Sequence, residues 1–213
     1  GAAWYVMGAT LVSGLAMRWL RDQVFGLFTP DAYDQMTTWA ASTPPGADGL
    51  IFLPYLTGER TPHMDPHARG MFLGLTADHD RGHLTRAVME GTTFALFDAY
   101  SVLASLGVAP TLAILAGGGA RSPLWQQIVA NVFGLPILPL ANVEGSALGA
   151  ALLAGAGIGE FELTSTARAW ARYGDPVQPD PATHDTYQRL LAIFRDAYVK
   201  HRDDFRLLAG MSG

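Results

Sequence analysis

Residues 112–124 read LAILAGGGARSPL, and this stretch decides the fold that we expect for the chain. The apolar run 112–116 is short, as is typical of a buried strand. Three glycines follow, and Ser122 and Pro123 then stand where a helix N-cap and a first helical turn are expected. A glycine turn between a strand and a helix N-terminus suits a phosphorylated ligand, because the ligand can approach the backbone and unpaired N–H groups attract an anion. The stretch alone does not separate such a site from an ordinary strand-to-helix turn.

This glycine turn matches neither of the two common nucleotide-binding motifs. The dinucleotide-binding fingerprint would need glycine where Ser122 stands, and a P-loop would need Gly-Lys-Ser or Gly-Lys-Thr. A serine hydrolase motif, Gly-x-Ser-x-Gly, is also not formed, because Ser146 lies one position too early within 145–149. We therefore interpret Ser146 as a residue at the start of a helix.

Composition indicates an ordered globular chain. Its 213 residues can bury the core of one domain or slightly more, and 49% of them are hydrophobic against 15% charged. A net charge of -5 and the lack of a basic run exclude a general nucleic-acid footprint. No apolar run reaches the length of about 20 residues that spans a membrane. Cysteine is absent, which fits a reducing, cytoplasmic setting.

The hydrophobic pattern on both sides of the glycine turn predicts an α/β chain. Strands are expected at 4–7, 49–54, 70–75, 112–116 and 135–140. Helices are expected from Ser13 to Gly26, over 31–41, from Asp80 to Gly107, after Ser122, and over 145–155 and 187–208. The proline-rich stretch 175–181 is expected to be a connector. The order of elements after residue 49 predicts an antiparallel pair followed by parallel strands joined by a helix.

A long loop is expected over residues 55–69, and loops of this length in a compact chain are usually functional or mobile. Glu59 and Arg60 are adjacent opposite charges within it. They form either an exposed ion pair of little energetic value or part of a loop that grips a partner domain or ligand, and we favour the second interpretation. Glu90, in the middle of the longest predicted helix, is either a buried anchor or part of a solvated face.

The same loop holds a His-x-Asp-x-His pattern, formed by His63, Asp65 and His67. Such side chains can bind a metal ion. Pro62 and Pro66 make the local geometry irregular, however, and histidines in polar loops are usually solvated. We therefore expect no metal site within the chain.

Several stretches together resemble the C-terminal half of the FGGY family of carbohydrate kinases. Residues 70–90 resemble the family's second signature at every specified position, and 117–125 are similar to its adenosine-binding motif. The further similar stretches are 14–22, 54–62 and 144–151. Residues 54–62 look most like the xylulokinase branch. The resemblance covers nearly the whole chain.

The resemblance implies an actin-like ATPase (ribonuclease-H-like) domain, with a mixed sheet flanked by helices. The family has two such domains with ATP between them. It transfers the γ-phosphate of ATP to a sugar hydroxyl, using Mg²⁺ and an aspartate base. The xylulokinase branch implies D-xylulose as the substrate and D-xylulose 5-phosphate as the product.

The resemblance also assigns candidate nucleotide-binding residues by position. They are Gly14, Arg18, Gly118, Gly119, Ala120 and Ser122. The glycine turn would face the nucleotide through its backbone, and the early helix would lie near it. Glu59 and Arg60 would belong to a domain-interface loop. Pro123 stands where glycerol kinases have an asparagine that contacts the nucleotide, so that side-chain contact is not expected here.

By this resemblance, residues 1–213 form the C-terminal, nucleotide-binding domain. The Asp-x-Gly-Thr phosphate loop, most of the sugar site and the catalytic aspartate belong to an N-terminal domain that the sequence does not contain, so no catalytic residue is expected here. The first two strands of the C-terminal sheet are also expected to be missing, which would leave a strand edge that is either covered by self-association, as in a homodimer, or left ragged. Two alternatives remain: a family kinase for another sugar or polyol, and a non-catalytic actin-like nucleotide-binding module.

Overall fold

The computed structural model of the chain describes residues 5–141 and 145–211. Its α-helices are α1 (Gly14–Trp19), α2 (Ala32–Ala41), α3 (Arg81–Ser105), α4 (Pro123–Phe133), α5 (Gly145–Gly157), α6 (Leu163–Trp170) and α7 (Pro181–Met211). Its strands are β1 (Ile51–Pro54), β2 (Gly70–Leu73), β3 (Ala113–Leu115) and β4 (Ile137–Pro139). A π-helical turn, η1 (Leu20–Phe25), continues α1, and η2 (Ala47–Gly49) and η3 (Gly118–Arg121) are short 3₁₀ helices. The predicted α/β class is confirmed.

The strands pair in the predicted order, an antiparallel pair first and a parallel pair second. β1 pairs with β2, with Ile51 opposite Leu73, and β3 pairs with β4, with Ala113 opposite Ile137. In the ranges described, the two pairs are separate two-stranded sheets. The parallel pair is joined through η3 and α4, which makes it a β-α-β unit.

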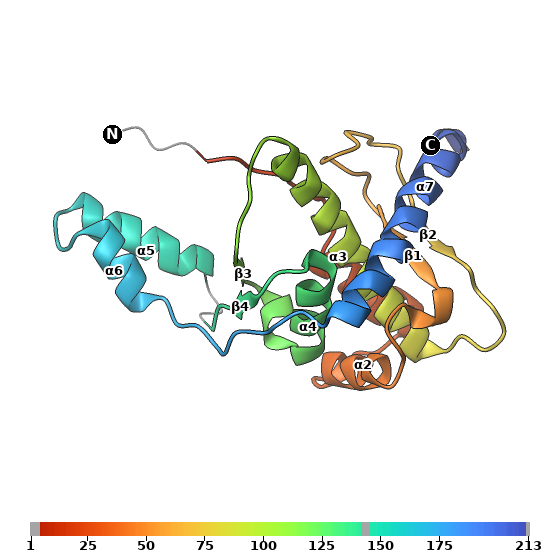
Figure 1. The fold of residues 1–213 in the computed structure, drawn as a ribbon, viewed down its shortest axis with the longest axis horizontal. Coiled ribbons are helices and arrows are strands. Elements are labelled where there is room, and N and C mark those ends of the chain that lie inside the picture. The colour runs from red at the N-terminus through yellow and green to blue at the C-terminus, as the bar shows by residue number, and fades with distance from the viewer. Residues whose placement is uncertain (1–4, 142–144, 212–213) are drawn as a thin grey trace.

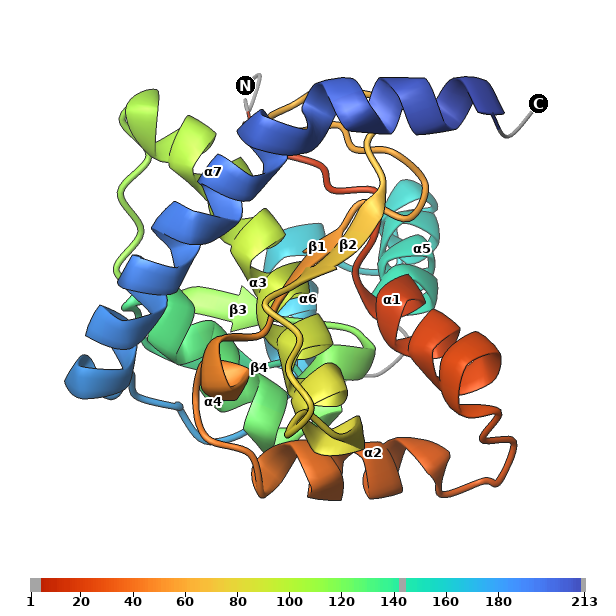
Figure 2. The same ribbon diagram turned by 90° about the vertical axis from the view of Figure 1, so that its right-hand side faces the viewer.

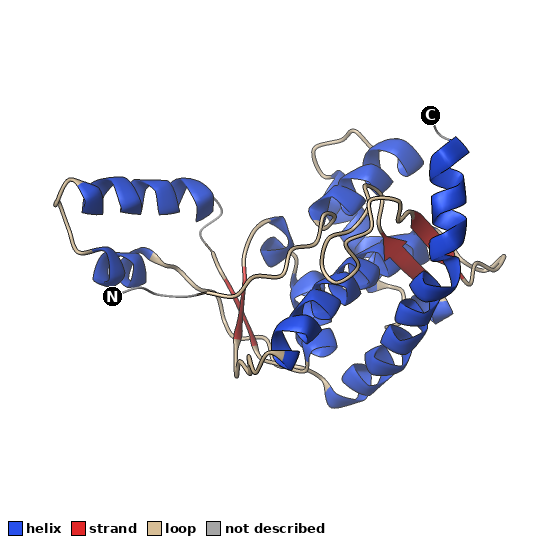
Figure 3. Ribbon diagram, turned by 90° about the horizontal axis from the view of Figure 1, so that it is seen from above, coloured by secondary structure: helices blue, strands red, loops and turns tan. Residues whose placement is uncertain are grey.

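One layered body holds most of the chain, with α3 at its centre (Figure 1). α3 packs on α2, β1 and α4, and α7 crosses the body to contact α4 and β1 (Figure 2). The largest fully buried side chains come from β1, the residue after it, α3 and α7: Phe52, Tyr55, Phe94, Tyr187 and Phe194. α5 and α6 pack on each other and project from one side of this body (Figures 1 and 3). No helix of the described chain has both the length and the apolar character to cross a bilayer.

Glycine allows α3 to lie directly against β1. A Cβ added at Gly91 would lie 2.0 Å from the carbonyl oxygen of Phe52, a distance that real side chains do not reach. The helix axis and the strand backbone are therefore closer than any other residue would permit.

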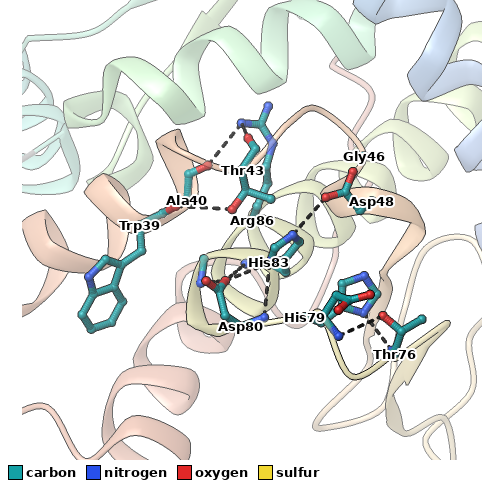
Figure 4. Close-up of polar contacts among 12 residues, drawn as sticks. Trp39, Ala40, Thr43, Gly46, Asp48, Thr76, His79, Asp80, His83 and Arg86 are labelled. Carbon is teal, nitrogen blue, oxygen red and sulfur yellow. Dashed lines mark hydrogen bonds and ion pairs between the residues drawn. The ribbon is translucent and has the colours of Figure 1, made fainter.

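The start of α3 is fixed by a capping box at Asp80, the residue at which the sequence predicted this helix to begin. The Asp80 carboxylate accepts the N–H groups of Gly82 (2.8 Å) and His83 (3.2 Å). The His83 ring bonds Asp80 (2.8 Å) and also reaches Asp48 in η2 (3.0 Å; Figure 4). These hydrogen bonds, with Asp80 as the main cause, raise the pKa of His83. The cap thus ties η2 to the first turn of α3.

One turn further along α3, Arg86 and Glu90 form a buried ion pair. The Arg86 Nε–Glu90 Oε1 distance is 2.8 Å, and both side chains are almost fully enclosed. Arg86 also donates to the carbonyl oxygens of Ala40 and Thr43, at the end of α2 (Figure 4). Of the two sequence interpretations of Glu90, the buried anchor is therefore the right one.

Two predictions for apolar strands were wrong. Residues 5–7 form no strand and are exposed, and Trp4, which began that predicted strand, lies outside the described residues. β3 is shorter than the predicted run 112–116, and Ile114 is 56% exposed rather than buried. An apolar run indicates a strand, but its burial depends on elements packed against it, and within residues 5–141 and 145–211 β3 pairs with β4 alone.

Helix boundaries near the C-terminus also differ from expectation. α7 begins at Pro181, six residues before the predicted start at 187, because Pro181 occupies the first helical turn instead of ending a connector. Asp180 caps it by accepting the N–H of Thr183 at 2.8 Å. α6 was not predicted. It has only eight residues, fewer than the window over which apolar periodicity identifies a helix, and none of them is buried.

Candidate functional site

The glycine turn lies at the carboxyl end of β3. Because β3 and β4 are parallel, the connection that follows each strand lies at the same edge, where open α/β sheets bind their ligands. Gly117 has φ 83° and ψ -165°, a conformation that is essentially restricted to glycine. The first glycine is thus required by the backbone, whether or not a ligand binds.

The turn is held in place by side chains of α4. Ser122 caps α4 as predicted, since its Oγ accepts the N–H of Trp125 (3.3 Å), and Pro123 occupies the first turn. Gln126 Nε2 donates to the carbonyl oxygen of Ala120 (2.7 Å). The Trp125 indole N–H donates to Thr93 Oγ1 (3.1 Å), which fixes α4 to α3. The turn is therefore a rigid shape rather than a loose loop.

The second and third glycines present accessible backbone. A Cβ added at Gly118 would meet nothing within 4 Å, and one at Gly119 would meet only the Trp125 ring, at 3.5 Å. Ala120 is buried, and its N–H donates to the Gly117 carbonyl (3.1 Å). The predicted set Gly118, Gly119, Ala120 and Ser122 is thus one continuous turn, in which the two glycines offer the open surface.

The other predicted pair, Gly14 and Arg18, lies on α1. Both residues are exposed, and a Cβ added at Gly14 would meet nothing within 4 Å. The predicted helix began at Ser13, but the Ser13 side chain makes no capping hydrogen bond to α1. These two positions come from a different element than the glycine turn and face solvent.

Residues 55–69 form an ordered loop in which Glu59 and Arg60 behave differently. Arg60 is exposed, whereas Glu59 is only 2% exposed. Glu59 Oε1 accepts the N–H groups of Arg60 (2.6 Å) and Leu11 (3.0 Å). Burial raises the pKa of Glu59. The pair is therefore not an exposed ion pair: Glu59 grips this chain's own backbone, and Arg60 is the member available to a partner.

Two side chains of the His-x-Asp-x-His pattern, those of His63 and Asp65, contact tyrosines. His63 Nε2 lies 3.1 Å from the Tyr55 hydroxyl, and its ring stacks on that of Tyr198 at 3.6 Å. Asp65 accepts the Tyr198 hydroxyl at 2.9 Å. Burial lowers the pKa of His63 to about 4. Over residues 5–141 and 145–211, no group of three or more His, Asp or Glu side chains could hold a metal ion.

Sequence reasoning missed the residues that support the glycine turn. Trp125 was identified as the last residue of the stretch similar to the adenosine-binding motif, but its contact with α3 was not predicted, and Gln126 and Thr93 were expected only as helix residues. Gln126 and Trp125 lie within the first turn of α4, where a side chain can reach back to the preceding loop, and this position was the available signal. Thr93 had no signal, because its contact joins residues 32 positions apart.

Comparisons with known proteins agree with this geometry. Residues 1–158 match the model of the FGGY family of carbohydrate kinases, C-terminal domain. The chain is 36% identical over 196 residues to a xylulose kinase of Staphylococcus epidermidis, covering 92% of this chain and 39% of that protein. It is 32% identical over 202 residues to a gluconokinase of Bacillus licheniformis, covering 90% of this chain and 39% of that protein.

A solved structure shares the fold. The crystal structure of xylulose kinase from Rhodospirillum rubrum superimposes with a TM-score of 0.82 at 37% identity, covering 93% of this chain and 40% of that one. The chain thus spans about two fifths of the length of the relatives it matches. With a family model matched over most of its residues, the chain belongs to the FGGY family of carbohydrate kinases, in the region of their C-terminal domain.

Proposed function

We propose that residues 1–213 form the ATP-binding C-terminal domain of a kinase that transfers the γ-phosphate of ATP to a hydroxyl of D-xylulose. Family membership supports an ATP-dependent carbohydrate kinase. The observation that carries the nucleotide assignment is the braced, accessible glycine turn between β3 and α4. Such a turn lets a nucleotide lie against the backbone, where a side chain would exclude it.

In this proposal, Gly118 and Gly119 contact the nucleotide through their backbone, and Ala120 and Ser122 set the shape of that surface. Arg18 supplies positive charge from α1, and Gly14 leaves room for the ligand at the start of that helix. Phosphoryl transfer depends mainly on positioning and on stabilising charge. The contribution of this chain is therefore to hold and orient ATP.

The remaining parts of the reaction are assigned to residues outside this chain. Mg²⁺, when bound, neutralises charge on the phosphates. The donor set of the described residues does not fit a metal held by this chain alone, so we route no step through it. The aspartate base and most sugar contacts are proposed to lie in a preceding domain. We accordingly expect no sugar-kinase turnover from the 213-residue chain by itself.

Xylulose is favoured over other sugars by the relatives. Five of the curated relatives are xylulose kinases at 33–36% identity, and two gluconokinases match at 32% and 36%. A kinase for another sugar or polyol is therefore the nearest alternative, and a non-catalytic nucleotide-binding module is the second. We also propose a cytoplasmic setting, which the absence of cysteine supports.

Calorimetric titration of the chain with ATP tests the nucleotide assignment. We expect binding that Gly118→Val weakens by about tenfold or more, because a branched side chain would occupy the ligand's place. Thr111→Val, at an exposed position two residues before β3, is the matched control. Undetectable ATP binding by the unaltered chain would refute the assignment. Turnover with xylulose, gluconate and other sugars after the preceding domain is supplied then separates the kinase alternatives from a non-catalytic module.

A further inference from the structure

Loop 55–69 is held in a fixed conformation by hydrogen bonds within the loop and to α7. Glu59 and Asp65 exchange two backbone hydrogen bonds, both 2.9 Å long. Asp65 also accepts the Tyr198 hydroxyl of α7 at 2.9 Å. Gly58, with φ +80°, lies so close to Pro66 that an added Cβ would be 3.0 Å from its Cα. These contacts fix the base of the loop to α7.

The same loop holds the segment that leads into α1. Thr61 N–H donates to the Ala9 carbonyl (2.9 Å), and Ala9 N–H donates to Thr61 Oγ1 (3.1 Å). Two residues on, Leu11 N–H donates to Glu59 Oε1 (3.0 Å). Val12, the next residue, is completely buried. The loop therefore determines where the chain enters α1.

α1 has no side-chain cap of its own. Asp80 and Ser122 bond the first N–H groups of α3 and α4, but Ser13 makes no such bond. Leu11 is three positions from Gly14, where α1 begins. Glu59 is thus the side chain that fixes the backbone immediately ahead of α1.

Stability alone gives a poor account of a glutamate at this position. Glu59 is 2% exposed, and its second oxygen, Oε2, is buried without a hydrogen-bond partner in the described part of the chain. A buried oxygen left unsatisfied opposes folding. Burial raises the pKa of this carboxyl, which reflects the same penalty on its charged form. What the buried glutamate provides is an acceptor that holds the N–H of Leu11 in place.

We propose that Glu59 is a positioning residue for the nucleotide-binding surface: it couples loop 55–69 to α1 and so sets the place of Gly14 and Arg18. The proposal rests on the function proposed above, in which these two residues lie at the nucleotide. Arg60 is the exposed neighbour of Glu59. A contact between the loop and a partner would therefore act on the coupling to α1 through Arg60. A shift of the loop would reach α1 through Leu11, without any contact between the loop and ATP.

The test compares four variants of the chain. Glu59→Ala removes the carboxylate acceptor, and Glu59→Gln keeps an oxygen for both N–H groups. Thr61→Val removes the Oγ1 that accepts the Ala9 N–H. Glu160→Ala is a control at an exposed glutamate. The readouts are MgATP affinity by calorimetry and amide hydrogen exchange along the chain. We expect Glu59→Ala to weaken ATP binding about tenfold and Thr61→Val to weaken it in the same direction. Glu59→Gln and Glu160→Ala should bind as the unaltered chain does.

Hydrogen exchange separates positioning from a general loss of stability. We expect Glu59→Ala to speed exchange at residues 9–18 while α3 and α7 keep their protection. Uniformly faster exchange, or local loosening with unchanged ATP affinity, would overturn the inference. If the unaltered chain and Glu59→Ala bind ATP equally well, this inference is overturned and the proposed function is not. No ATP binding by the unaltered chain would overturn the proposed function, and this inference with it.

Discussion

At Glu90, donors from three separate segments meet on one carboxylate oxygen. Oε1 accepts from Arg86 Nε of α3 (2.8 Å), the Tyr187 hydroxyl of α7 (2.7 Å) and the Gly46 N–H ahead of η2 (3.0 Å). Arg86 Nη2 in turn donates to the Tyr187 hydroxyl at 3.2 Å. Burial raises the pKa of Glu90, and Arg86 opposes that change. One side chain therefore connects the middle of the sequence to both of its flanks.

We expect Glu90→Leu to lower the free energy of unfolding by about 3–5 kcal/mol, because it leaves the Arg86 guanidinium buried without a counter-charge. Urea denaturation followed by circular dichroism measures the change. The double variant Arg86→Met/Glu90→Leu should recover part of the loss, since no buried charge remains. A loss below about 1 kcal/mol for Glu90→Leu would contradict the role assigned to this pair.

At the scale of residues, the sequence predicted the roles of side chains whose hydrogen-bond partners are near in the chain. Ser122 was identified as a cap, and Asp80 as the residue that opens α3, because a cap bonds residues two or three positions away. Glu90 was left open because α3 is buried on several sides, which removes the periodicity that separates a core face from a solvated one. The partner of Glu59, Leu11, lies 48 positions away, so no local pattern could reveal it.

At the scale of elements, the contact of α3 with β1 depends on Gly91. We expect Gly91→Ala to destabilise the fold by about 1–3 kcal/mol or more, because its Cβ would overlap the Phe52 carbonyl oxygen. Gly149→Ala is the matched control, since it lies in α5 with nothing within 4 Å of the added Cβ, and should be neutral or mildly stabilising. Thermal unfolding of both variants checks this, and equal effects would exclude close packing as the cause.

The first turn of α6 gives a prediction about pH. Glu162 accepts the N–H groups of Ser165 (2.6 Å) and Thr164 (2.8 Å), and these bonds lower its pKa from 4.5 to about 2. A lowered pKa means that the cap is fully effective above pH 4.5 and is lost as pH falls toward 2. Amide chemical shifts of Thr164 and Ser165 should follow this loss. In Glu162→Ala, the same shifts should not change over that range.

The strands show that the sequence of an element does not reveal whether that element is buried. From β1 to α5, the order of strands and helices was predictable from alternating apolar runs and turn residues. Whether an apolar strand would be buried was not predictable, because the segments that pack against it lie far away in the sequence. Ile114 has the side chain of a core strand and is nevertheless 56% exposed.

At the scale of the whole molecule, apolar surface gathers around the edge of β3 that no described strand pairs with. An apolar groove of about 280 Å³ lies there, lined among others by Leu103, Ile114 and Phe133. Unpaired strand edges and exposed apolar patches of this kind favour association. We expect the isolated chain to form dimers in which this groove is covered, and Ile114→Lys to shift the population toward monomer. Sedimentation velocity over a range of concentrations measures this, and a strictly monomeric unaltered chain would refute it.

The α5–α6 pair has a thermodynamic consequence. α5 buries one residue, Leu152, and α6 buries none, while Gly155 lies against the Phe161 ring and Phe161 packs edge-on against Trp170. The pair thus draws its stability from its own short-range contacts, whereas the body shares one core. Units with separate cores unfold separately. Heating should accordingly give two calorimetric transitions, the α5–α6 pair melting first, so that a single melting temperature would not describe this chain.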